Sequence, residues 1–162
     1  MGRALAALLL LAGCAAPGDA GPAALEAPGW ALSTAGTGTW EEAREDEHVL
    51  VRAWVDAWVA NLRYDKRVFV EVLAPYGEGR FHRTLFPAEH RGAEGGRERW
   101  GTDEIEIYPE GGPWGAPLAG PVAYRLSMQH SIGGQDRVVH TPWRALYGEG
   151  ALVLPEEGPF QA

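Results

Sequence analysis

Residues 49–59 read Val-Leu-Val-Arg-Ala-Trp-Val-Asp-Ala-Trp-Val. Every second residue in this stretch is valine or alanine, which is the two-residue period of a strand with one buried face. The β-branched valines favour the same structure. A helix is the competing interpretation, because Leu50, Trp54, Trp58 and Leu62 recur at four-residue steps. The alternation and the valine content favour the strand.

Other short alternating segments occur along the chain, separated by loops rich in glycine and proline. The clearest is residues 68–73, and the others are residues 30–40, 81–86, 100–108, 122–128, 137–140 and 151–154. Gly133 and Gly134 predict a hairpin turn, whereas residues 41–47 and 88–99 lack an apolar period and are expected to be loops. About seven or eight short strands with no convincing helix predict an all-β, antiparallel β-sandwich.

The first residues have the features of an export signal. Arg3 precedes an apolar run that is far too short to span a bilayer. Residues 11–14, Leu-Ala-Gly-Cys, match the lipobox of bacterial lipoproteins, although an ordinary signal peptide followed by a chance cysteine is the alternative. We therefore expect a signal peptide at 1–13 and a lipidated Cys14 in the cell envelope. The residue after this cysteine is Ala15 and not Asp, which by the general sorting of lipoproteins favours the outer membrane.

This interpretation divides the chain into four parts. The signal is followed by a flexible Ala/Pro/Gly tether at 14–29, a sandwich domain at 30–154 and a tail at 155–162. Cys14 is the single cysteine, so the sandwich is expected to fold without an internal disulfide. Removal of Arg3 with the signal leaves 13 basic against 22 acidic residues, a formal charge of −9. This acidic balance argues against a nucleic-acid partner.

No catalytic motif stands out in the sequence. The histidines at 48, 82, 90, 130 and 140 are scattered, and His82 and His90 lack a third ligand at metal spacing. Asp103 stands beside Glu104 and Glu106, which share one strand face, but nothing in the sequence would raise the pKa of only one carboxyl, as glycoside hydrolysis requires. We expect a protein that is not an enzyme and has no metal or cofactor.

The aromatic composition is unusual, with seven tryptophans and five tyrosines against four phenylalanines. Trp and Tyr combine a flat apolar face with a polar edge, and sugars stack on such rings. In an exported β-sandwich this excess suggests carbohydrate binding. The alternative is that the rings belong to the core and rim of the domain.

Residues 59–70, Val-Ala-Asn-Leu-Arg-Tyr-Asp-Lys-Arg-Val-Phe-Val, resemble the signature of family 21 carbohydrate-binding modules, which bind starch and glycogen. The resemblance extends over about residues 48–147 and implies an immunoglobulin-like sandwich. It also implies that Tyr64 stacks on glucose and that Lys66 donates to sugar hydroxyls. Tyr76 is a candidate to replace the tryptophan of the family's second site, and Trp100 and Trp143 are further candidates.

Together these features predict a non-catalytic, lipid-anchored module that binds an α-glucan or another polysaccharide. The alternative is an envelope lipoprotein that has kept the sandwich and uses its Trp-rich surface, or an edge strand, to bind a protein partner.

Overall fold

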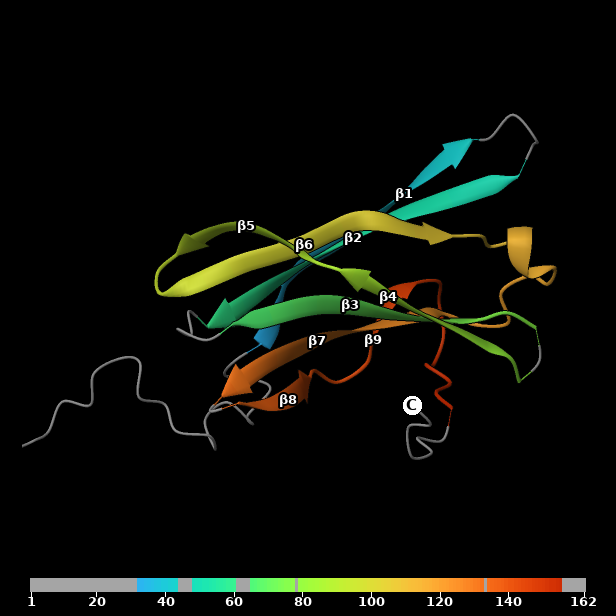
Figure 1. Cartoon of the computed structure of the whole chain (residues 1–162). Helices are drawn as coiled ribbons and strands as arrows, with labels where there is room; N and C mark the ends of the chain where they lie inside the picture. Colours follow the sequence, from blue (N-terminus) through green and yellow to red (C-terminus); the bar gives the residue numbers. More distant parts are fainter. Residues whose placement is uncertain (1–31, 44–47, 61–64, 78, 133, 156–162) are drawn as a thin grey trace, which may run out of the picture.

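A computed structural model describes residues 32–43, 48–60, 65–77, 79–132 and 134–155, which form two antiparallel sheets packed face to face (Figure 1). Sheet A has the order β1-β2-β6-β5, formed by β1 (Leu32–Ala43), β2 (Val49–Ala60), β6 (Arg97–Ile107) and β5 (Glu89–Glu94). Sheet B has the order β4-β3-β7-β8, with β9 also paired to β7; its strands are β4 (Phe81–Pro87), β3 (Lys66–Pro75), β7 (Val122–Ile132), β8 (Gln135–His140) and β9 (Arg144–Tyr147). The predicted all-β sandwich is confirmed, and the order of its strands is the immunoglobulin-type order.

The alternating segment of residues 49–59 is a strand and not a helix. Val51, Val55 and Val59 are fully buried between the sheets, and Trp54 and Trp58 project from the opposite, outer face. The helical spacing of the large residues was coincidental, because pairing with β1 on one side and β6 on the other gives the segment two ladders of backbone hydrogen bonds.

The core is aliphatic and lies between the two sheets. Alternate residues of β3 face it, and across the ladder they meet Leu126 and Met128 of β7. Ile105 and Ile107 of β6 contribute from sheet A. Each such side chain stabilises the fold by roughly 1.5–3 kcal/mol on burial.

Three boundaries differ from the sequence-based expectation. The loop predicted at 88–99 contains β5 and the start of β6, joined at Gly95 and Gly96, whose positive φ angles suit a tight hairpin. These residues lack an apolar period because β5 is an edge strand that buries almost nothing. Residues 151–154 form no strand; β9 lies beside β7 instead. Strand β1 extends to Ala43, so the described residues contain nine strands.

β4 and β5 are one extended segment that changes sheet. Only Ala88 separates them, and its backbone N–H donates to the carbonyl of Val68 at 2.9 Å. β5 then pairs with residues 97–101 of β6 and leaves residues 102–107 without a strand on that side, within the described part of the chain. The sandwich is therefore less closed along this half of β6.

Between β6 and β7 the chain forms one turn of 3-10 helix, η1 (Gly112–Trp114). No helix of the described residues is long and apolar enough to span a membrane.

Candidate functional site

Two of the predicted sugar-binding residues meet inside the molecule. Lys66 begins β3, and its ammonium lies 2.8 Å from the carboxylate of Glu98 on the opposite sheet, with 7% of its side chain exposed. The indole N–H of Trp100 donates to the same carboxylate at 3.0 Å. Burial acts to raise the pKa of Glu98, but the hydrogen bonds from Lys66 and Trp100 outweigh it and lower the pKa, so the carboxylate stays ionised. Lys66 and Trp100 therefore join the two sheets at one end of the sandwich.

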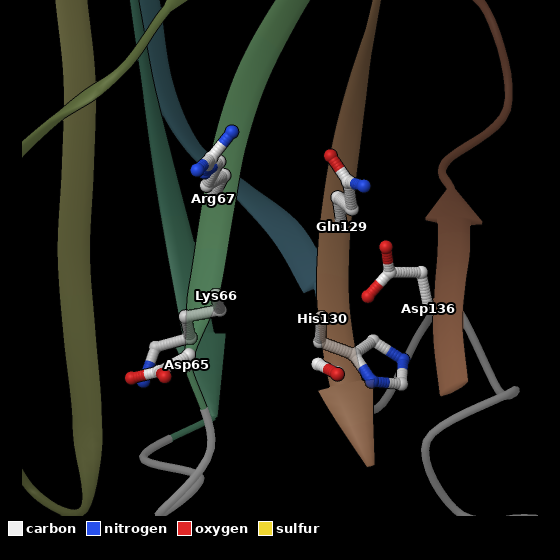
Figure 2. A pocket seen from close by; sticks show the side chains of 7 residues that line it. Asp65, Lys66, Arg67, Gln129, His130 and Asp136 are labelled. Atoms are coloured by element: carbon white, nitrogen blue, oxygen red, sulfur yellow. The ribbon is translucent and has the colours of Figure 1, made fainter. Parts of the chain in front are cut away.

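A polar hollow of about 380 Å³ opens beside Lys66. Figure 2 shows Arg67 on β3, Gln129 on β7 and Asp136 on β8 around it. His130 is the register partner of Lys66 and is 1% exposed, and neither of its ring nitrogens has a hydrogen-bond partner within the described residues. Burial, with the charge of Arg137 in addition, lowers the pKa of His130 and favours the neutral ring. No Trp, Tyr or Phe is among the described residues that line the hollow.

The other predicted residues lie elsewhere. Tyr76 follows β3 at the end opposite Lys66, is 5% exposed, and accepts a hydrogen bond from the backbone N–H of Tyr108 at 3.1 Å. Trp143 lies against sheet B, with the guanidinium of Arg125 4.6 Å from its ring centroid. Tyr64 and Cys14 lie outside the described residues. The structure thus brings Lys66 and Trp100 together but separates them from Tyr76 and Trp143.

A different set of tryptophans shares one surface, the outer face of sheet A. Trp54 and Trp58 of β2 project from this face, and Trp40 of β1 joins them because it is the register partner of Arg52. Trp40 is 46% exposed, and Trp54 and Trp58 are partly exposed. We call these three rings the tryptophan face.

Trp54 packs on two glycines of β1, Gly36 and Gly38, which leave the backbone of that strand uncovered by side chains on this face. A Cβ on Gly38, its register partner, would lie 2.8 Å from Cε2 of the indole, and a Cβ on Gly36 would lie 3.0 Å from Cη2. Because the two glycines meet opposite parts of the ring, the indole lies flat along the backbone of β1. This arrangement leaves the second face of the ring directed away from the sheet.

Charged side chains surround the tryptophan face, where arginines and carboxylates bind one another. Asp56 is buried beneath it and binds Arg99 and Arg91, the latter at 3.2 Å. The guanidinium of Arg97 lies 4.9 Å from the ring centroid of Trp58.

Arg52, at the other end of the face, binds Glu42 at 3.0 Å and Glu106 at 2.7 Å. The face can therefore donate hydrogen bonds beside its rings without carrying a large net charge.

The tryptophan face was missed in the sequence, although a signal for it exists. Gly36 and Gly38 are two residues apart within a strand, and an interior glycine of a strand often marks a close approach of another group. Here the pair lies beneath Trp54 of the next strand.

The histidines and carboxylates give no sign of a metal centre. Among the described residues no three His, Cys, Asp or Glu side chains are grouped to hold an ion. Comparison of the chain with protein-family models and with curated proteins gives no match.

Proposed function

We propose that this chain is a non-catalytic, lipid-anchored module of the bacterial envelope that binds a polysaccharide on its tryptophan face. The observation that carries the proposal is the indole of Trp54, which lies flat on Gly36 and Gly38 with Trp40 and Trp58 on the same side of the sheet. Sugar rings present flat C–H faces, which stack on the faces of aromatic rings such as these indoles.

Contact with Gly36 and Gly38 of β1 fixes the position of the Trp54 ring before any ligand binds. A ring held in this way loses little rotamer freedom on binding, so more of its contact energy contributes to affinity. Each stacked ring is expected to contribute about 1 kcal/mol beyond area burial. The face is open and shallow, so the expected affinity is weak and depends on several sugar units bound together.

The charge balance of the face favours a neutral polysaccharide. Arg52, Arg91 and Arg99 bind the carboxylates of Glu42, Glu106, Asp56 and Asp103, and Arg97 over Trp58 brings the arginines to four, so positive and negative charges near the rings balance. The resemblance of residues 59–70 to family 21 carbohydrate-binding modules makes an α-glucan the first ligand to test.

The test is affinity electrophoresis of the Cys14→Ser chain in gels that contain soluble starch, glycogen, xylan or a mixed-linkage β-glucan. We expect retardation by at least one of them, weakened roughly five- to ten-fold by Trp54→Ala, because one stacking ring is lost. Trp143→Ala removes a tryptophan from the other sheet and should leave the retardation unchanged. No retardation in any gel, or equal effects of the two substitutions, would overturn the proposal.

A second function, strand addition to a protein partner, is favoured by the edge position of β1. This strand has 12 residues, and the described chain pairs it only with β2. An unpaired strand of this length can accept another strand. Under this alternative, amide protons on the free edge of β1 would exchange slowly on native membranes and quickly in the purified chain, and no polysaccharide would retard the protein.

A further inference from the structure

A second concave site lies on the less closed side of the sandwich; it shares Glu106 with the charged border of the tryptophan face but none of the three tryptophans. It is a cleft of about 350 Å³ between β4 and the half of β6 that β5 leaves uncovered, and η1 closes one end of it. This volume is in the range of clefts that hold small molecules.

Aromatic rings form one wall of the cleft. The ring of Trp114 stacks on His82 with centroids 3.5 Å apart and lies 5.9 Å from the ring of Tyr76. Trp114 is 44% exposed even though it is packed on these neighbours. Part of its π surface is therefore open to the cleft and to solvent.

The loop that carries Trp114 is held in place from both sides. The N–H of Gly77 donates to the carbonyl of Pro117 at 3.1 Å, and the N–H of Ala119 donates to that of Pro75 at 2.7 Å. Gly112 has a φ of 40°, and a Cβ there would lie 2.8 Å from Cγ of Tyr108. The loop therefore packs so closely that only glycine fits at this position, and the aromatic wall is formed before a ligand binds.

The carboxylates at the cleft belong to Glu104 and Glu106 of β6. Among the described residues that line it there is no lysine or arginine. Glu106 accepts a hydrogen bond from the hydroxyl of Tyr108 at 2.6 Å and also binds Arg52. No described side chain pairs with the carboxylate of Glu104. The charge of the lining is therefore complementary to a cation.

The floor of the cleft is apolar. It is formed by Val72, Ala74 and Ile107, and the hydroxyl of Tyr76 is already engaged with the backbone of Tyr108. A sugar hydroxyl placed on this floor would lose its hydrogen bonds to water and find no replacement, which is unfavourable. An alkylated ammonium has no such requirement, since its charge is stabilised by π faces and by carboxylates at a distance.

We propose that this cleft binds a small organic cation, a quaternary ammonium group with an apolar body, between the ring of Trp114 and the carboxylate of Glu104. The site does not depend on polysaccharide binding, because it shares no tryptophan with the tryptophan face.

The probe is choline, compared with 3,3-dimethylbutan-1-ol, its uncharged carbon isostere. Binding to the Cys14→Ser chain would be followed by NMR through the indole N–H signals. We expect choline to bind at least several-fold more tightly than the alcohol and to shift the signal of Trp114. Equal affinities, or no choline binding at millimolar concentration, would overturn the proposal.

Two substitutions locate the site. Trp114→Ala should weaken choline binding roughly two- to thirty-fold, the range of a cation–π contact from exposed to desolvated. Glu104→Gln keeps shape and fold, and should weaken choline binding while leaving the alcohol unaffected. Trp54→Ala, in the tryptophan face, is the matched control and should change neither; a loss with Trp54→Ala as large as that with Trp114→Ala contradicts the proposed site.

Discussion

The outer faces of the two sheets carry similar residues in different arrangements. Each has a buried carboxylate bound by two arginines, with tryptophan nearby: Asp56 with Arg91 and Arg99 on sheet A, and Glu71 with Arg83 and Arg125 on sheet B. On sheet B the ring of Trp143 lies over Arg125, which is itself buried. On sheet A both arginines are partly exposed, and Trp54 rests on glycines beside the ion pairs. The same residue types bury one arginine beneath a tryptophan on sheet B, although Arg83 is 38% exposed, and leave both arginines partly exposed on sheet A, so the ion pairs of sheet B are the more closed of the two.

The two faces should differ most in how much stability is lost when the buried carboxylate is neutralised. Glu71→Gln should lower the free energy of unfolding by about 3 kcal/mol, because it removes the charge that compensates the buried guanidinium of Arg125. Asp56→Asn should cost less, about 1–2 kcal/mol, because Arg91 and Arg99 can turn to water. Urea unfolding of both variants measures the two losses. Equal losses, or a larger one for Asp56→Asn, would show that the sheet B face is no more closed than sheet A.

A smaller loss of stability is expected when a methyl group is placed between β1 and the ring of Trp54. Gly38→Ala should cost about 1–2 kcal/mol, since the new methyl group overlaps the indole and the ring must tilt. The same variant should bind polysaccharide more weakly although no ring is removed. Gly120→Ala is the control, because its Cβ would meet only Pro75 at 3.7 Å. Unchanged polysaccharide retardation in Gly38→Ala would mean that the flat orientation of Trp54 is unimportant.

The smallest expected effect is on how the free energy of unfolding falls as the pH is lowered. Burial acts to raise the pKa of Glu71, but hydrogen bonds from Arg125 and Arg83 outweigh it and hold the pKa below 4.5, its ordinary value. A carboxyl with a lowered folded-state pKa stabilises the fold above its unfolded pKa, and this contribution is lost as pH falls through the folded value. Between pH 6 and pH 3 the wild-type chain should therefore lose more stability than Glu71→Gln. Parallel curves for the two proteins, measured by urea unfolding at each pH, would contradict this assignment.

The strand pattern of the fold could be predicted because burial on one face imposes a two-residue period. Residues 49–59 show it, and pairing confirms it. The polar edge strand Glu89–Glu94 could not be found in this way, since neither of its faces is strongly buried. Residues 151–154 have the apolar composition of a strand, but β9 already occupies the adjacent edge of β7.

Site residues were harder to predict because a single sequence does not show which side of a strand is accessible. Lys66 and Tyr76 are polar or amphipathic residues of the kind that bind sugars, yet both are directed into the molecule at opposite ends of β3. Glu71 reads as a solvent-facing residue of an alternating strand, but Arg83, Arg125 and the neighbouring strands bury it. The position of Trp54 depends on two glycines in another strand, so it follows from register as well as from composition.

The point at which the chain enters the sandwich bears on how the molecule would stand on a membrane. Leu32, the first residue of β1, is the register partner of Val59, which lies beside Glu98 at the Lys66 end. The cleft lies near Ile107 and Val51, at the other end of β2, eight residues or about 26 Å away. In the lipid-anchored form that we propose, the tether from Cys14 would join the sandwich at the Lys66 end, and the cleft would lie at the opposite end of the domain. The tryptophan face would then lie along the side between the attachment point and the cleft, so that neither proposed ligand would have to pass the point of attachment.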